Sequence, residues 1–107
     1  MHVLRALPLL VASMSACAAG GVDEMALGKR LFQEGGGGQP ACAACHTLKD
    51  AGSQGEIGPG LDEIKPDAQR VATAMRNGIG AMPSFQGKLS DAEIQAVATY
   101  VAAVAGR

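Results

Sequence analysis

The sequence of 107 residues contains no tryptophan and only three aromatic side chains, namely Phe32, Phe85 and Tyr100. Hydrophobic residues make up 48% of the chain, but most of them are alanine, valine and leucine. A short chain with so little bulky material builds a small core, and small cores are only marginally stable. The sequence therefore predicts that something besides side chains fills the interior.

The sequence also lacks an excess of charge of either sign. Its formal net charge is −1, and no run of lysine or arginine is present. Basic residues are not interleaved with aromatic ones, as they are in many surfaces that bind nucleic acid. We therefore expect no nucleic-acid partner.

No apolar run is long enough to span a bilayer. The first residues instead follow the order of a secretory signal peptide: a short basic start, an apolar stretch and then small residues. We expect residues 1–18 to be removed, with the cut near Cys17 to Ala19. One cut leaves a mature domain of residues 19–107, and the other, at a segment that resembles a bacterial lipobox, lipidates Cys17. Either cut places the protein in the periplasm, tethered to a membrane only if Cys17 is lipidated.

The mature chain is predicted to form helices joined by glycine-rich loops, because no run shows the alternation of a strand. The first helix is expected over 24–34, with Asp23 as its N-cap and Gly35 at its end. The run Gly35–Gly38 is costly to order, so it is interpreted as a flexible spacer. It lacks the Gly-Lys-Ser/Thr ending of a phosphate-binding loop.

Three further helices are expected in the second half of the chain. A short helix around 61–65 is stopped by Pro66. The next helix begins after the cap residue Asp67 and is closed by Gly78. The last one begins with a capping box over 90–93, where serine and glutamate stand three residues apart.

The segment Cys42-Ala43-Ala44-Cys45-His46 matches the Cys-x-x-Cys-His sequence of c-type haem attachment. Two thiols about one turn apart add to the two vinyl groups of one porphyrin. The next residue, His46, is then delivered beneath the iron, to which its neutral ring donates a lone pair. A covalently held haem also accounts for the shortage of bulky side chains.

Other interpretations of these cysteines are weaker. A thioredoxin-type site requires a strand before Cys42, and none is predicted. A structural zinc site requires four ligands, whereas two cysteines and His46 supply three once His2 leaves with the signal peptide. A disulfide between Cys42 and Cys45 would close a very small loop and stabilise little.

Met82 stands in the irregular segment 77–85, where glycines and Pro83 exclude a helix interior. An apolar side chain in such a loop gains little unless something holds it. Methionine is a common second axial ligand opposite histidine in electron-transfer cytochromes. Met82 is therefore the predicted partner of His46 at the iron. Met75, which shares a helix face with Val71, is interpreted as a core residue, and an open iron with Met82 as loop filler remains the alternative.

With these motifs in place, the chain over about residues 23–105 resembles a class I c-type cytochrome. Gly28 and Phe32 match the signature of the N-terminal helix in that family, and Tyr100 matches the aromatic residue of the C-terminal helix. The resemblance implies an all-α cytochrome c fold, with three to five helices around a covalently bound haem. Ten positions separate Phe32 from Cys42, more than is usual in the family, so the glycine run is expected to be an insertion that bulges from the surface.

The resemblance also assigns roles to the loop after the haem motif. The carbonyl of Pro59 would accept a hydrogen bond from the ring of His46, and Leu61 would pack against the haem. It further implies a periplasmic carrier of single electrons rather than an enzyme, with one haem c as cofactor. Redox proteins that dock transiently would be its partners. The ending of the chain also resembles cytochrome subunits that accept electrons from periplasmic dehydrogenases, sulfite dehydrogenase among them. A haem protein with an open iron that binds ligands is the remaining alternative.

Overall fold

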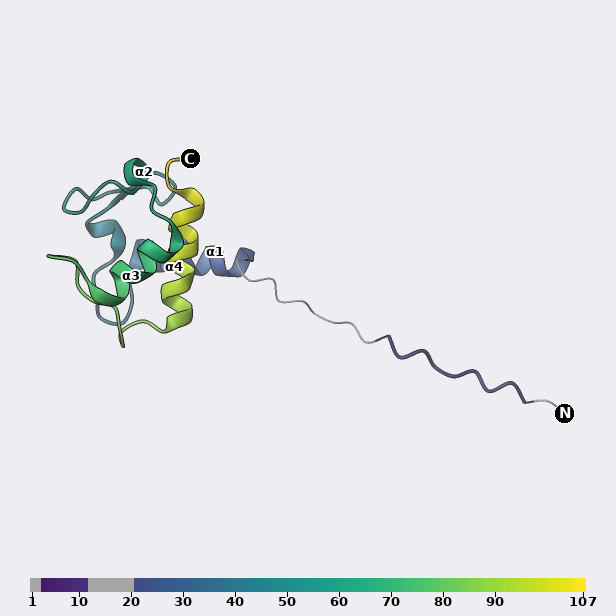
Figure 1. The fold of residues 1–107 in the computed structure, drawn as a ribbon. Coiled ribbons are helices and arrows are strands. Elements are labelled where there is room, and N and C mark those ends of the chain that lie inside the picture. Colours follow the sequence, from purple (N-terminus) through teal and green to yellow (C-terminus); the bar gives the residue numbers. More distant parts are fainter. Residues whose placement is uncertain (1–2, 12–20) are drawn as a thin grey trace.

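The computed structural model describes residues 3–11 and 21–107. Within 21–107, four α-helices are present (Figure 1). They are α1 (Val22–Glu34), α2 (Leu61–Ile64), α3 (Ala68–Asn77) and α4 (Asp91–Val104), and a short 3₁₀ helix, η1 (Cys42–Ala44), follows α1. Residues 3–11 form neither helix nor strand. Cys17 and the expected cut near it lie outside the described residues, and no helix in the described part of the chain is long and apolar enough to cross a membrane.

The expectation of no sheet is wrong in one detail. Strands β1 (Thr47–Leu48) and β2 (Ser53–Gln54) pair antiparallel beside the haem motif. The Ser53 hydroxyl accepts a hydrogen bond from the backbone N–H of Leu48 at 3.0 Å and donates one to the carbonyl of His46 at 2.8 Å. Two-residue strands are too short to show a period of two in the sequence. The Ser53 side chain therefore links β2 to both Leu48 and His46.

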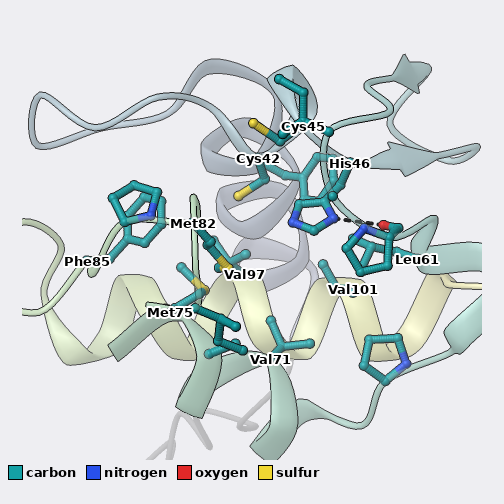
Figure 2. A pocket seen from close by; sticks show the side chains of 18 of the residues that line it. Cys42, Cys45, His46, Leu61, Val71, Met75, Met82, Phe85, Val97 and Val101 are labelled. Carbon is teal, nitrogen blue, oxygen red and sulfur yellow. Dashed lines mark hydrogen bonds between the residues drawn. The ribbon is translucent and has the colours of Figure 1, made fainter. Parts of the chain in front are cut away.

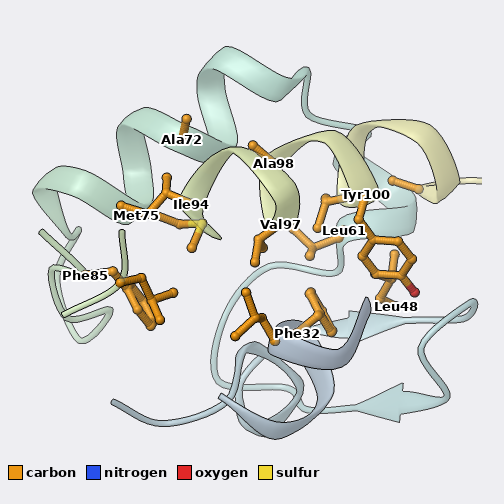
Figure 3. Packing of buried hydrophobic residues seen from close by; sticks show 14 residues of the cluster. Phe32, Leu48, Leu61, Ala72, Met75, Phe85, Ile94, Val97, Ala98 and Tyr100 are labelled. Carbon is orange, nitrogen blue, oxygen red and sulfur yellow. The ribbon is translucent and has the colours of Figure 1, made fainter. Parts of the chain in front are cut away.

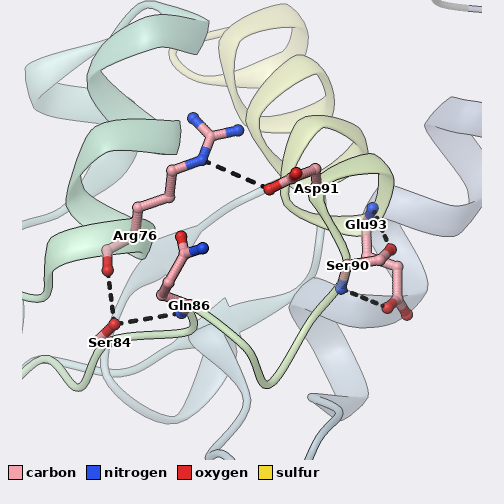
Figure 4. Close-up of polar contacts among 6 residues, drawn as sticks. All are labelled: Arg76, Ser84, Gln86, Ser90, Asp91 and Glu93. Carbon is pink, nitrogen blue, oxygen red and sulfur yellow. Dashed lines mark hydrogen bonds and ion pairs between the residues drawn. The ribbon is translucent and has the colours of Figure 1, made fainter.

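The cap residues of α3 and α4 are confirmed. The backbone N–H of Arg70 donates to the Asp67 carboxylate at 2.7 Å. Ser90 and Glu93 exchange both bonds of the capping box, at 3.1 and 2.9 Å (Figure 4). A 3.9 Å ion pair between Arg76 and Asp91 joins the end of α3 to the start of α4.

The start of α1 differs from the prediction. The helix begins one residue before Asp23, and its N-cap is Gly21, which has no side chain to bond to the first turn. Asp23 lies in the first turn, where a negative charge is favourable near the helix N-terminus. The end at Gly35 is as predicted, and the positive φ of 75° there suits glycine.

Helices α1 and α4 cross in close contact. A Cβ atom on Gly28 would lie 2.2 Å from the carbonyl oxygen of Ala96 and 2.6 Å from Cβ of Tyr100. The absence of a side chain therefore allows the backbones to meet. Next to this crossing, the rings of Phe32 and Tyr100 pack edge to face at 6.1 Å (Figure 3). The Tyr100 hydroxyl donates to Asp50 at 2.5 Å, which fixes the turn between β1 and β2 against α4.

The hydrophobic core lies between α1, α3 and α4 (Figure 3). Met75 is 1% exposed and Phe32 is equally buried, so the core interpretation of Met75 is confirmed. Most other members are alanine, valine, leucine and isoleucine, as the composition predicts.

The glycine run departs from the predicted flexible spacer. Gly37 and Gly38, at its tip, are exposed, but the run as a whole lies against the chain near residues 84–89. A Cβ atom on Gly36 would lie 3.1 Å from Cδ2 of Leu89, and one on Gly37 would lie 2.2 Å from the carbonyl oxygen of Lys88. Tertiary contacts, which composition does not report, order this segment.

Candidate functional site

The haem motif forms a single tight turn. In η1 and the residues that follow it, the N–H groups of Cys45 and His46 both donate to the carbonyl of Cys42, at 3.1 and 2.9 Å. This winding sets Cys42 and Cys45 one 3₁₀ turn apart and delivers the imidazole beside them. Figure 2 shows both sulfur atoms and the imidazole at the same pocket.

The ring of His46 is held through one of its two nitrogens. Its Nδ1 atom lies 2.8 Å from the carbonyl oxygen of Pro59 (Figure 2). A carbonyl only accepts hydrogen bonds, so Nδ1 carries the proton and the lone pair of the neutral ring is on Nε2. A ring in this state is ready to bind a metal through Nε2.

The loop between β2 and α2 fits closely over the haem motif, a contact that the sequence alone does not reveal. A Cβ atom on Gly58 would lie 2.5 Å from Cε1 of His46, and one on Gly55 would lie 2.7 Å from the backbone of Cys45. The N–H of Gly58 also donates to the carbonyl of Cys45 at 2.7 Å. The glycines of this segment were the available signal, but only the structure shows what they approach.

The pocket beside the haem motif has a volume of about 290 Å³. Leu61 and Met82 line it together with the two cysteines and His46, and Met82 lies across the pocket from His46 (Figure 2). Its other walls are mainly apolar side chains. They come from α1, α3 and α4 and, in larger number, from α2 and the loops, which include Ile57, Ile79 and Phe85. Arg70 is the one lysine, arginine, aspartate or glutamate among the described residues that line the pocket.

Burial raises the pKa of the Cys42 thiol to about 11. Reactive thiols of disulfide oxidoreductases have lowered pKa values, because positive charges or a helix N-terminus stabilise the thiolate. The environment of Cys42 is the opposite, since apolar surroundings stabilise the neutral thiol. This observation disfavours the thioredoxin-type interpretation.

The donor chemistry and shape of the pocket fit a haem. Two thiols, an imidazole with its lone pair on Nε2 and a thioether surround a space with apolar walls. A porphyrin is flat and largely apolar, so such walls suit it. In the described ranges 3–11 and 21–107, no three histidine, cysteine or acidic side chains gather closely enough to hold a metal ion.

Comparisons with known proteins point to the same cofactor. The family model described as cytochrome c oxidase, cbb3-type, subunit III matches residues 23–101. Cytochrome c6 of Leptolyngbya boryana is 41% identical over 69 residues, which cover 56% of this chain and 75% of that protein. Cytochrome c6 of Tetradesmus obliquus is 34% identical over 89 residues, covering 73% of this chain and 88% of its own.

A solved structure is similar as well. The crystal structure of the c-type cytochrome SorU from Sinorhizobium meliloti superposes with a TM-score of 0.74 at 56% sequence identity. The match covers 79% of this chain and 94% of SorU. The matched family region, 23–101, contains the haem motif, Pro59, Leu61 and Met82. The chain therefore belongs to the c-type cytochromes, mostly helical electron carriers with one covalently bound haem c, and is not itself a catalytic enzyme.

Proposed function

We propose that Cys42 and Cys45 form the two thioether bonds to the haem, and that His46 and Met82 are the axial ligands of its iron. The observation that carries this proposal is the orientation of His46. Its Nδ1 is bonded to the Pro59 carbonyl at 2.8 Å, which leaves Nε2 free in a pocket that Met82 also lines. When bound, the haem supplies an iron that gains and loses one electron.

The residues around the pocket adapt it to electron transfer. The Pro59 carbonyl makes the His46 ring a better electron-pair donor. The apolar walls and the thioether of Met82 disfavour the more highly charged ferric state, which raises the reduction potential. With His46 and Met82 both bound, no coordination position is left for a substrate, so the site functions as a carrier of single electrons.

The experiment that tests this assignment uses the purified mature holoprotein. We expect a reversible one-electron potential, a sulfur–iron absorption band in the ferric form and slow binding of carbon monoxide to the ferrous form. Rapid binding of carbon monoxide at neutral pH, with no sulfur–iron band, would show an open iron and refute the role of Met82.

We also propose that residues 1–18 form a signal peptide and that the mature domain begins near Cys17 to Ala19 in the periplasm. The order of basic, apolar and small residues supports this. The intact mass of the mature protein tests both cuts, because a diacylglycerol on Cys17 adds mass that a cut before Ala19 does not. An uncleaved N-terminus in a competent host would contradict the proposal.

A second candidate function is that of an electron-accepting subunit held by a periplasmic dehydrogenase, for example a sulfite dehydrogenase. The resemblance of the C-terminal sequence to such subunits favours it. Ile57 and Ile79, which are 76% and 68% exposed, line the same pocket and give its rim an apolar surface on which a partner can dock. A complex with a dehydrogenase that persists on gel filtration would support this role, whereas a holoprotein that elutes alone would favour the free carrier.

A further inference from the structure

Residues 35–39 form a tight reversing turn, here called the glycine turn. Gly36 and Gln39 pair across it, and the N–H of Gln39 donates to the carbonyl of Gly36 at 3.1 Å. Gly37 and Gly38, at the tip, both have positive φ angles, of 63° and 76°. Such angles are strained for other residues, so glycine is required for this geometry.

The glycine turn lies against the segment that follows Met82. The side-chain amide of Gln39 donates to the carbonyl of Ser84 at 2.8 Å in a partly buried bond. A few residues further on, Gly37 touches the backbone of Lys88, since a Cβ atom would lie 2.2 Å from its carbonyl oxygen. The contact thus includes one hydrogen bond and one approach that only glycine permits.

The other side of the Met82 segment is fixed to α3. The N–H of Phe85 donates to the carbonyl of Met75 at 2.7 Å, and the Ser84 hydroxyl donates to the carbonyl of Arg76 at 2.5 Å (Figure 4). Ser84 is therefore held from two sides, by α3 through its hydroxyl and by the glycine turn through its carbonyl. Without Gln39, Ser84 would keep its bonds to α3 and to the N–H of Gln86 but lose the bond to the glycine turn.

The position of this contact in the chain gives it a role. Gln39 lies three residues before Cys42, and Ser84 lies two residues after Met82. The bond between them therefore joins the two segments that supply opposite walls of the pocket. An opening of the Met82 segment that also moves Ser84 breaks this bond.

We propose that the glycine turn is a strap that holds the Met82 loop closed, and that Gln39 is a positioning residue for the Met82 sulfur. This inference rests on the proposed ligation of the iron by Met82. The strap slows and disfavours the opening in which an external ligand replaces that sulfur. Gln39 itself touches neither the iron nor the porphyrin in this role.

The test is a titration of the ferric holoprotein with imidazole, which competes for the position of Met82, read from the sulfur–iron absorption band. We expect Gln39→Ala to raise the apparent affinity for imidazole about fivefold, the factor that corresponds to losing one partly buried hydrogen bond. The matched control is Gln33→Ala, which removes a bond of the same type from an exposed helix site, Gln33 to the Ala51 carbonyl at 3.1 Å. The control is expected to leave the affinity for imidazole unchanged.

A second variant, Gly37→Ala, is expected to have a larger effect of the same sign, because its new methyl group forces the turn away from Lys88. Should this variant fail to fold, Gln39→Ala alone still decides the matter. Equal imidazole affinities for wild type and Gln39→Ala, with the band intact in wild type, would overturn the strap and leave the ligand assignment standing. Equal increases in Gln39→Ala and Gln33→Ala would also overturn it, as a sign of general destabilisation. A wild-type protein without the band would overturn the ligand assignment and the strap together.

Discussion

Nδ1 of His46 and the carbonyl oxygen of Pro59 lie 2.8 Å apart, across a loop that touches the haem motif at several points. The N–H of Gly58, next to Pro59, donates to the carbonyl of Cys45, next to His46. The two bonds run between neighbouring pairs of residues, so neither the loop nor the ring moves without the other. The orientation of His46, the proposed iron ligand, thus depends on Gly58 and Pro59, which lie twelve and thirteen positions further along the chain.

Replacing Gly58 by alanine tests this dependence. The new Cβ atom would lie 2.5 Å from Cε1 of His46, and it either tilts the ring or pushes the loop outward. We expect a loss of about 1–3 kcal/mol in the free energy of unfolding, the usual cost of overpacking, together with a lower yield of holoprotein. The measurements are thermal unfolding and the ratio of haem absorbance to protein.

Gly60→Ala is the matched control for that variant. A Cβ atom there meets nothing closer than the Glu63 side chain, at 3.5 Å, and its φ of −66° suits alanine. We expect wild-type stability and haem content. If the two variants behaved alike, the contact of Gly58 with His46 would not be what fixes the ring.

Replacing Met82 by alanine is expected to leave the haem attached while the sulfur–iron band disappears. The reduction potential should fall by on the order of 100 mV, well within the ~0.8 V range that axial ligands control. Met75→Leu is the control, because Met75 also lines the pocket but is 1% exposed in the core. If the reduction potential fell in Met75→Leu and not in Met82→Ala, the ligand would be Met75 and the assignment of Met82 would be wrong.

Replacing both Cys42 and Cys45 by alanine is expected to give little folded protein. The pocket of about 290 Å³ is lined by side chains of α1, α3 and α4, so an unfilled pocket leaves the core without its centre. Circular dichroism and resistance to proteolysis of the apoprotein are the measurements. A helical, cooperatively unfolding apoprotein would contradict the idea that the haem organises the core.

Gly28→Ala sets helix propensity against packing at the crossing of α1 and α4. Alanine is favoured over glycine inside a helix by about 1 kcal/mol. A Cβ atom at Gly28 would, however, lie 2.2 Å from the backbone oxygen of Ala96, which cannot move without shifting α4. We expect net destabilisation of roughly 1–3 kcal/mol by chemical denaturation. The control is Ala26→Gly, at an exposed position of α1, which measures the effect of helix propensity alone. A Gly28→Ala variant more stable than wild type would show that the helices do not cross this closely.

The carboxylate of Asp62 is expected to make the free energy of unfolding depend on pH in the acidic range. It accepts bonds from the N–H groups of Gly106 and of Lys49, both at 2.8 Å, and these bonds lower its pKa below the ordinary value of 3.8. Because the pKa of Asp62 is lower in the folded state, its charged form stabilises the fold at pH values above the ordinary pKa. This stabilisation is lost as the pH falls through the pKa of the folded state. We expect the stability difference between wild type and Asp62→Asn to be constant near neutral pH and to shrink below about pH 4. A difference that stays constant to lower pH would contradict the assignment.

The sequence by itself determined the family and the cofactor of this protein. Cys42, Cys45 and His46 stand at a spacing that few other sites require, and the glycine-rich loop around Met82 led to the prediction that its sulfur is the second iron ligand. The caps at Asp67 and Ser90 were also readable, because capping depends on residues within one turn of each other. All of these signals are local, so they are present in the order of residues.

The tertiary structure decided what depends on segments far apart in the chain. Gly58 lies over His46, Ser53 holds the backbone of His46, and Gln39 reaches Ser84, which is 45 residues away. The glycine run looked like a flexible spacer because glycine has a high conformational entropy when nothing contacts it. In the folded chain the same absence of a side chain lets Gly37 approach the backbone of Lys88. Whether a glycine loosens or tightens a segment is therefore set by its neighbours in space.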